Sequence, residues 1–324
     1  MSCDLSDDPF SFGRTSGGGE AAASAAPAAQ TFSDILCVPF SGLLKKYRFD
    51  TTVKPHGSGT FGKVYLGVVQ ETGRPVAVKK IFSRSTPRNP KSSPEAVIRE
   101  ATTAMLFDSP NLCKVYGFSV DDAGFVYIVM EQINGIEAFD FFNDNIRLGK
   151  TNPCLVKRIF LDIARGLATL HKAGFAHRDI KLDNVMLEFS KTGEFERAVI
   201  IDFGFTMLVS EIPHGSQQGS ICYSAPEMIK GVDQLTVKID IWALGVMLFV
   251  SLHGYYPIWS KNPNPSAEAR EVYQKLQKLT ESPVLPIYTE GNKDVNILRM
   301  ICARCLDFDQ STRISADELL ALLS

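Results

Sequence analysis

Short runs of alternating apolar and polar residues, the pattern of β-strands, fill the chain from about residue 47 to residue 131. Their length and spacing predict a small antiparallel sheet. Pro55 and His56 interrupt the first run, which therefore predicts an edge strand, because proline cannot donate to a sheet ladder. The runs that predict strands are residues 51–54, 64–69, 76–82, 114–120 and 125–131.

Helical periodicity appears once among these runs and then dominates the rest of the chain. Residues 94–107 have an apolar face, and Ser92 and Ser93 stand before them as an N-cap region. From Pro153 onward, residues 156–172 predict a long amphipathic helix. Residues 239–252 are almost wholly apolar, so this helix is expected to be buried on all sides.

The beginning of the chain has a different composition. It is rich in Gly, Ala and Ser and cannot bury enough apolar surface to offset the entropy lost on ordering. We expect a flexible tail over residues 1–46 and a folded unit from Tyr47. The first residues are acidic, poor in arginine and without an apolar segment, unlike secretory signals and mitochondrial leaders. The expected location is therefore intracellular, cytoplasmic or nuclear.

The overall composition excludes some classes of protein. Of 324 residues, 45% are hydrophobic, which suffices for a sizeable core, and the net charge of −2 gives no reason to expect nucleic acid as a partner. A membrane-spanning helix needs about 18 or more consecutive apolar residues, and the sequence has no such run.

The seven cysteines are odd in number and scattered, as expected for reduced thiols. Cys302 and Cys305 form a C-x-x-C pair, but their apolar helical setting favours packing over metal binding or redox chemistry. Four histidines show no ligand spacing and are interpreted as structural or exposed: His56, His171, His214 and His253.

Several short motifs carry groups suited to handling phosphates and metal ions. A glycine loop, G-S-G-T-F-G-K-V, spans residues 57–64, and its glycines would let backbone N–H groups approach phosphates. Lys79 lies among apolar neighbours, where a lysine needs a charged partner. Downstream come H-R-D-I-K-L-D-N at residues 177–184, D-F-G at 202–204 and A-P-E at 225–227.

These elements, in this order, resemble the eukaryotic protein kinases. A dinucleotide-binding domain is the alternative for the glycine loop, but that loop should open a helix, and here it runs into a β-rich segment. The resemblance covers residues 47–324. It implies an α+β fold with a small β-rich lobe and one helix over residues 47–131, a hinge near Glu131, and a larger, mostly helical lobe over residues 132–324.

The resemblance implies that Lys79 pairs with a glutamate of the following helix and contacts ATP phosphates. Glu95 and Glu100 compete for this role, and the spacing from Glu100 to Asn111 favours Glu100.

Four residues of the two downstream loops match the catalytic and metal positions of the family. Asp179 would orient the substrate hydroxyl and accept its proton, and Lys181 would stabilise charge on the transferring phosphoryl group. Asn184 and Asp202 would hold Mg²⁺, which prefers oxygen ligands.

The nucleotide site follows from the same resemblance. Met130 matches the gatekeeper, Glu131 and Ile133 the hinge, and Glu137 the ribose contact. His56 stands where the family usually has an aliphatic residue. The expected ATP-binding residues are His56, Gly57, Ser58, Gly59, Thr60, Phe61, Gly62, Val64, Ala77, Lys79, Met130, Glu131, Ile133, Glu137 and Met186.

Other matches concern activation and architecture. Ser216 is the expected activating phosphorylation site, with Ser210 as an alternative, and Arg178 would pair with the phosphate. Ser220, in G-S-x-x-Y-x-A-P-E, would contact Asp179 and Lys181. The expected structural residues are His177, Phe203, Gly204, Asp240, which anchors the catalytic loop, and the pair Glu227 and Arg313.

The implied function is phosphorylation of protein Ser or Thr by ATP and Mg²⁺, with a weak likeness to the calmodulin-dependent and AMP-activated groups. Lys181, two residues after Asp179, favours Ser/Thr over Tyr. Glu137 and Asp183 suggest substrates with basic residues before the acceptor. An upstream kinase, or the chain itself, would activate it.

A pseudokinase scaffold and a small-molecule kinase are the alternatives. Loss of a catalytic residue would favour the pseudokinase, and loss of A-P-E would favour the small-molecule kinase.

Overall fold

The structure, a computed structural model, describes residues 39–59, 62–82, 94–216, 218–258, 265–286 and 293–324. These described residues belong to one compact unit. Within the described ranges, no helix is long and apolar enough to cross a bilayer.

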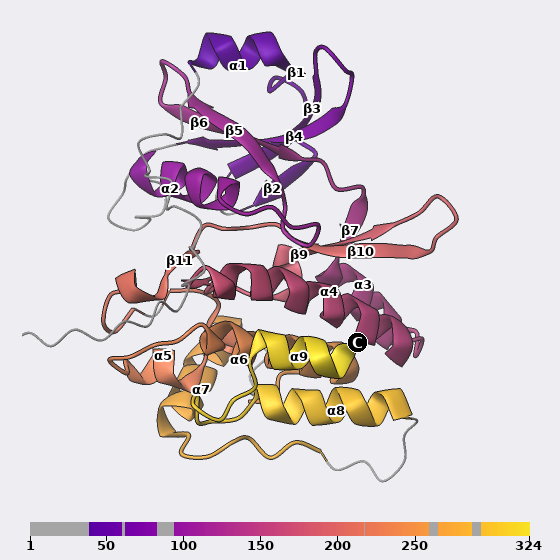
Figure 1. Cartoon of the computed structure of the whole chain (residues 1–324), viewed down its shortest axis with the longest axis vertical. Coiled ribbons are helices and arrows are strands. Elements are labelled where there is room, and N and C mark those ends of the chain that lie inside the picture. Colours follow the sequence, from indigo (N-terminus) through magenta and orange to yellow (C-terminus); the bar gives the residue numbers. More distant parts are fainter. Residues whose placement is uncertain (1–38, 60–61, 83–93, 217, 259–264, 287–292) are drawn as a thin grey trace, which may run out of the picture. The chain divides into compact units, whose positions relative to one another are not determined.

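An antiparallel sheet forms the centre of the N-terminal lobe (Figure 1). The strand order is β1-β3-β4-β6-β5, and β2 pairs with β3. Because side chains alternate along a strand, Val76 and Val78 share one face of β4 while Ala77 and Lys79 share the other. The strands are β1 (Tyr47–Phe49), β2 (Gly57–Gly59), β3 (Gly62–Val69), β4 (Pro75–Phe82), β5 (Val115–Val120) and β6 (Phe125–Glu131).

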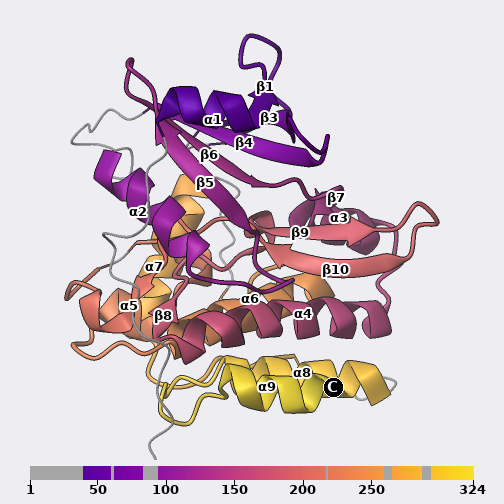
Figure 2. The same ribbon diagram turned by 45° about the horizontal axis from the view of Figure 1, so that its top comes forward.

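Two helices cover opposite faces of this sheet (Figures 1 and 2). Helix α1 (Phe40–Lys46) buries Leu43 in a cluster with Val76 and Val78. Helix α2 (Pro94–Met105) lies on the face that carries Lys79 and contributes Ala101 to a pocket beside it. The sheet thus has a purely structural side and a side that faces the functional groups.

Helix α1 lies inside the predicted tail, because its seven residues directly precede Tyr47, the predicted start of the folded unit. Leu43 is only 2% exposed, and the Phe40 ring lies 4.7 Å from that of Tyr127. This helix was not predicted, because seven residues are too few to give a clear periodic signal.

The strand predicted at residues 51–54 is absent, and a turn stands there. Asp50 Oδ1 accepts hydrogen bonds from Thr52 N at 2.8 Å and from Thr52 Oγ1 at 2.7 Å. This side-chain turn competes with strand pairing, and Pro55 removes a further donor.

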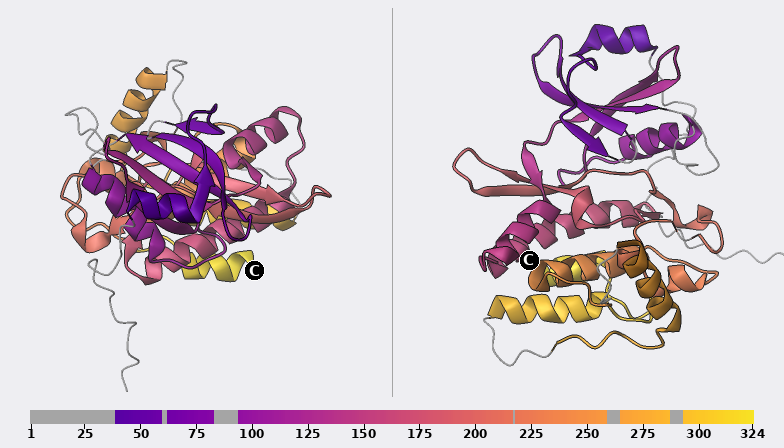
Figure 3. Two further views of the ribbon diagram at one scale, coloured as in Figure 1. Left: turned by 90° about the horizontal axis from the view of Figure 1, so that it is seen from above. Right: turned by 180° about the vertical axis from the view of Figure 1, so that it is seen from behind.

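The C-terminal lobe is mostly helical, which completes the two-lobed α+β architecture expected from the sequence (Figure 3). Helix α6, predicted as residues 239–252, is buried along nearly all its length. The helices are α3 (Ala138–Arg147), α4 (Pro153–Lys172), α5 (Pro226–Lys230), α6 (Lys238–His253), α7 (Pro265–Lys278), α8 (Lys293–Cys305) and α9 (Ala316–Leu323), with 3₁₀ turns η3 (Leu182–Asn184), η4 (Val209–Glu211) and η5 (Ile221–Tyr223).

Two small antiparallel sheets lie in this lobe and carry the functional loops. The first has the order β10-β9-β7, and the second pairs β11 with β8. Their strands are β7 (Gly135–Glu137), β8 (Phe175–Ala176), β9 (Val185–Phe189), β10 (Phe195–Ile200) and β11 (Met207–Leu208).

The segment between α2 and β5 lies against the C-terminal lobe. Cys113 N donates to Ile200 O at 2.8 Å, and Ile200 N donates to Asn111 O at 3.0 Å. Gly166 of α4 makes room for this contact, because a Cβ there would lie 2.9 Å from Asn111 O. The two lobes are therefore joined along β10 as well as through the covalent hinge.

Candidate active site

Lys79 lies on the α2 side of β4, within reach of two carboxylates. Its Nζ donates to Glu100 Oε1 at 2.6 Å and lies 3.9 Å from Asp202 Oδ1. Burial would lower the pKa of Lys79, but Glu100 and Asp202 outweigh it and raise the pKa. The lysine therefore stays charged, and the contact agrees with the choice of Glu100 over Glu95.

A pocket lies behind this pair, between the sheet and α2. Met130 and Phe203, predicted as gatekeeper and as the D-F-G phenylalanine, both line it. The full lining is Lys79, Glu100, Ala101, Ala104, Cys113, Val115, Ile128, Met130, Ile201 and Phe203.

The loop before η3 is held by one buried carboxylate. Asp240 accepts hydrogen bonds from His177 N at 2.7 Å and from Arg178 N at 2.8 Å. Arg178 has φ of 70°, a left-handed conformation that costs about 1–3 kcal/mol in a residue with a side chain. The two bonds to Asp240 offset this strain and fix the direction of the following residue, Asp179.

Sequence reasoning missed the partner on the other side of Asp240. His171 Nε2 lies 2.9 Å from Asp240 Oδ2, and its side chain is 8% exposed. Burial would raise the pKa of Asp240, but His171, His177 and Arg178 N together lower it, so the carboxylate stays ionised. No spacing signals a pair of residues 69 positions apart.

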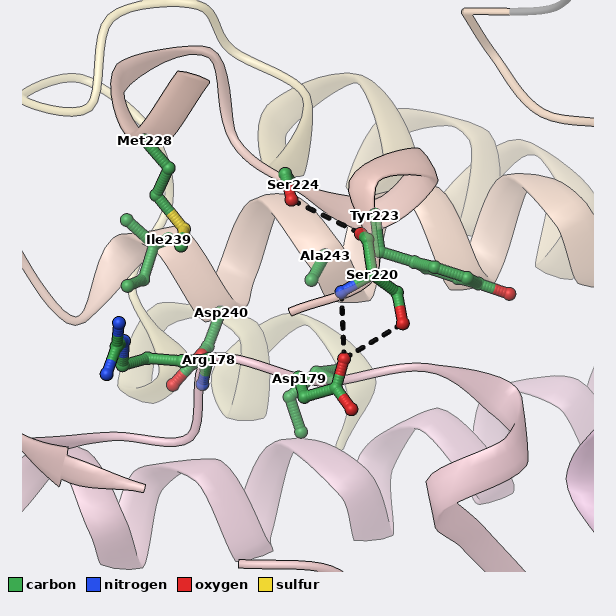
Figure 4. A pocket seen from close by; sticks show the side chains of 10 residues that line it. Arg178, Asp179, Ser220, Tyr223, Ser224, Met228, Ile239, Asp240 and Ala243 are labelled. Atoms are coloured by element: carbon green, nitrogen blue, oxygen red, sulfur yellow. Dashed lines mark hydrogen bonds between the residues drawn. The ribbon is translucent and has the colours of Figure 1, made fainter. Parts of the chain in front are cut away.

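Asp179 stands at the centre of the loop, with its side chain 6% exposed. Its Oδ1 accepts hydrogen bonds from Ser220 N and Ser220 Oγ, both at 2.9 Å (Figure 4). Its Oδ2 lies 3.1 Å from Lys181 Nζ and from Asn184 Nδ2. Lys181 Nζ also donates to Ser220 Oγ at 3.0 Å. Lys181, Asn184 and Ser220 thereby fix the position of the carboxylate.

Asn184 and Asp202 present oxygens suited to Mg²⁺. Asn184 Nδ2 donates to Asp179 O at 2.8 Å, which turns the amide oxygen away from that bond. Asp202 Oδ1 accepts from Gly204 N at 2.9 Å, and a carboxylate has two oxygens that can ligate a metal. Mg²⁺ with nucleotides is usually held by one or two side-chain oxygens plus phosphates, and this pair fits that pattern. Across the described ranges, no group of three or more His, Cys, Asp or Glu side chains could hold a metal by itself.

The C-x-x-C pair has the packing role predicted for it. Cys302 and Cys305 are buried in α8, and Cys302 Sγ lies 3.5 Å from Gly245 O. Burial raises the pKa of Cys302 to about 12.

The predicted adenine residues come from both lobes. Ala77 pairs with Met130 between β4 and β6, and Val64 pairs with Lys79 between β3 and β4. On the other lobe, Met186 of β9 pairs with Glu137 of β7. In the glycine loop, Gly59 pairs with Gly62 across the hairpin of β2 and β3, whereas Thr60 and Phe61 lie outside the described residues. His56 and Ser58 are exposed, and their contact with adenine or phosphate stays a prediction, as does the hinge role of Ile133.

Arg178 points to the predicted phosphorylation site. Its Nη2 donates to Ser216 Oγ at 2.6 Å, while Nη1 lies 3.0 Å from Met207 Sδ. Burial lowers the pKa of Arg178. The alternative site, Ser210, is an exposed residue of η4.

The predicted pair of Glu227 and Arg313 is present and buried. Arg313 Nη1 lies 2.5 Å from Glu227 Oε1, and Arg313 Nη2 lies 3.0 Å from Glu227 Oε2. Gly204 lies beside Glu100, and the rings of His177 and Phe203 are 5.9 Å apart.

The comparisons with known proteins agree with this geometry. The family model for the protein kinase domain matches residues 51–322. Serine/threonine-protein kinase KIN4 of Saccharomyces cerevisiae is 30% identical over 240 residues, which cover 70% of this chain and 28% of that protein. A probable serine/threonine-protein kinase of Dictyostelium discoideum is 31% identical over 268 residues, 82% of this chain and 29% of that protein.

A plant relative aligns over more of its own length. CBL-interacting protein kinase 2 of Oryza sativa subsp. japonica is 29% identical over 282 residues, 86% of this chain and 57% of that protein. The chain thus spans between 28% and 57% of these three relatives. With a family model that matches most of its length, this chain belongs to the protein kinase domain family.

Proposed function

We propose that the chain is a protein serine/threonine kinase that uses ATP and Mg²⁺. The observation that carries the proposal is the environment of Asp179, whose carboxylate contacts Lys181, Asn184 and Ser220. A fixed carboxylate beside a fixed ammonium group suits phosphoryl transfer, in which catalysis is mostly positioning and charge stabilisation.

In the proposed reaction, the oxygen of a substrate Ser or Thr hydroxyl forms a bond to the γ-phosphorus of ATP. The bond from that phosphorus to the β–γ bridging oxygen breaks, and ADP leaves. Asp179 orients the hydroxyl and takes its proton, and Lys181 stabilises charge on the transferring group. Lys79, held by Glu100 at 2.6 Å, positions the α- and β-phosphates. Asn184 and Asp202 would hold Mg²⁺, which would neutralise phosphate charge.

Activation by phosphorylation of Ser216 is part of the proposal. Arg178 already donates to Ser216 Oγ, and it directly precedes Asp179. A phosphate on Ser216 adds about −1.5 to −2 charge and three strong acceptors at this position. It would bind the guanidinium more tightly and so stabilise both the activation segment and the catalytic loop. Either an upstream kinase or a second copy of the chain could supply the phosphate.

The proposed substrates carry arginine or lysine shortly before the acceptor. Support comes from the carboxylates at the mouth of the site. Glu137 ends β7, Asp140 lies in the first turn of α3 and Asp183 lies in η3, and these three elements contact one another. Burial, together with the charges of Asp140 and Asp183, raises the pKa of Glu137. A guanidinium would relieve their repulsion and gain charge-assisted hydrogen bonds.

The test is transfer of labelled γ-phosphate from ATP to generic protein substrates, followed by identification of the labelled amino acid. Wild-type chain should label Ser or Thr and not Tyr. Asp179→Asn should retain folding and ATP binding but lose most of kcat, since the carboxylate acts in the transition state. If the wild-type chain binds ATP yet transfers no phosphate after treatment with an activating kinase, the pseudokinase alternative is correct.

A further inference from the structure

Arg197 of β10 holds three groups around the hinge between the lobes. Its Nη2 lies 2.5 Å from Glu131 Oε1, at the end of β6. Its Nε lies 2.7 Å from Glu188 Oε2 of β9, and its Nη1 donates to Pro110 O at 2.9 Å. One guanidinium therefore connects the hinge, the segment before β5 and the sheet of the C-terminal lobe.

The same cluster reaches the far end of the hinge through Glu188. While Oε2 of this carboxylate accepts from Arg197, Oε1 accepts from Asn134 N at 3.3 Å. The side chain of Glu131 and the backbone of Asn134 are thus both held, on either side of Gln132 and Ile133. Glu131 and Ile133 are the two hinge residues that are predicted to contact adenine.

The side chains of this cluster are largely shielded from water, so their ion pairs are only weakly screened. The side chains of Arg197, Glu131 and Glu188 are 25%, 22% and 16% exposed. A planar guanidinium offers a fixed fork of donors, so three acceptors at these distances define its orientation and theirs. An exposed ion pair of the same length would be screened and mobile.

We propose that Arg197 is a positioning residue for ATP, which acts through Glu131 and Glu188 by holding the hinge peptides in the arrangement that binds adenine. It does not touch the nucleotide itself. The inference rests on the proposed function for the identity of the ligand, but the restraint on the hinge is a property of the chain without ATP.

The variant Arg197→Met removes the donors and keeps an apolar stem of similar length. Arg158→Met is the matched control. Arg158, on α4, contacts the same strand through Phe195 O at 3.1 Å and the Phe195 ring, but it is not among the groups that hold the hinge. Similar melting temperatures for the two variants would show that the two changes affect the stability of the fold equally.

Two measurements test the proposal. Amide hydrogen exchange without nucleotide should become about fivefold faster or more at Ile133 and Asn134 in Arg197→Met, and stay at the wild-type rate in Arg158→Met. The Kd of a fluorescent ATP analogue with Mg²⁺ should rise by about fivefold or more in Arg197→Met only, a typical coupling between linked sites.

Steady-state kinetics should separate positioning from a general structural role. In Arg197→Met, KM for ATP should rise, while kcat at saturating ATP and KM for a peptide substrate stay within about twofold of wild type. Adding Glu188→Gln to Arg197→Met should change Kd by less than about twofold, because the Glu188 side chain is held by Arg197 and the two residues act together.

Unchanged exchange at the hinge, or unchanged Kd, in Arg197→Met overturns the inference, and so does an equal effect of Arg158→Met. Failure of the wild-type chain to bind ATP would contradict the proposed function instead. In that case the exchange rates at Ile133 and Asn134 alone decide whether Arg197 restrains the hinge.

Discussion

Two ion pairs of similar length, one in each lobe, have different surroundings. In the N-terminal lobe, Lys79 and Glu100 are 2.6 Å apart, with side chains 14% and 13% exposed. In the C-terminal lobe, Arg313 and Glu227 are 2.5 Å apart, with side chains 0% and 6% exposed. The chemistry of pairing is the same, but only the first pair borders the pocket beside the predicted phosphate site.

The difference lies in what else each cation binds. Arg313 donates to the carbonyls of Asp307 and Lys238, both at 2.9 Å, and lies over the Trp242 ring. Its hydrogen-bonding capacity is largely used within the lobe. Lys79 has three donors, and besides Glu100 its Nζ has Asp202 at 3.9 Å. We infer that the buried pair of Arg313 and Glu227, the closed pair, supports the fold. The pair of Lys79 and Glu100, which borders the pocket, serves a ligand.

Removing the closed pair should have the largest effect, on stability. Arg313→Ala leaves a buried, unpaired Glu227 and should lower the free energy of unfolding by about 3–5 kcal/mol. Denaturant unfolding measures this. Arg304→Ala is the control, because Arg304 forms an exposed pair with Glu318 at 3.7 Å and should cost less than about 1 kcal/mol. Equal losses from both variants would contradict the distinction drawn here.

Removing the pair that borders the pocket should affect turnover instead. Lys79→Met should lower phosphoryl transfer by about 10²-fold or more, because phosphate positioning is lost, while the melting temperature changes little. Glu100→Ala should act in the same way. The control Lys80→Met changes the neighbouring lysine, whose Nζ lies 4.3 Å from the Phe125 ring. If Lys79→Met unfolds the lobe, or if Glu95→Ala is the more damaging change, the assignment of this pair is wrong.

Some of these contacts could be predicted from the sequence and others could not. The pair of Arg313 and Glu227 and the choice of Glu100 came from motif positions, and both contacts are present. His171 and Arg197 were missed, because neither residue lies in one of these motifs and no local pattern marks its contact with Asp240 or Glu131. The family motifs thus include both groups that handle the ligand and some that support the fold, whereas supporting residues outside the motifs are determined by packing.

The fold shows a similar limit. Helix α6 was predicted within one residue at each end because its apolar run is long and unbroken. Helix α1 and the turn at Asp50 were not predicted. Both depend on single contacts, the burial of Leu43 and the bonds from Thr52, that outweigh the local average of the sequence.

A smaller effect is expected at Ser216, the proposed phosphorylation site, which accepts a hydrogen bond from Arg178. Ser216→Ala should lower activity by about tenfold, the value of one strong charge-assisted contact. Adding Arg178→Ala should lower it little further, because the two residues act on each other. Ser210→Ala is the control and should keep full activity. A phosphate mapped to Ser210, with Ser216→Ala fully active, would move the activation site to η4.

The smallest effect should appear at Glu137, whose pKa is raised by burial and by the charges of Asp140 and Asp183. Glu137→Ala should reduce the preference for arginine before the acceptor by a few-fold, about 1 kcal/mol or less, since exposed pairs are screened. A positional peptide library measures the preference. KM for ATP should change less than the preference does.

Because the pKa of Glu137 is raised above 4.5, the preference should weaken on acidification at a higher pH than an ordinary glutamate would give. A library without basic preference, or one that requires proline after the acceptor, would assign these carboxylates to ribose binding and loop structure alone.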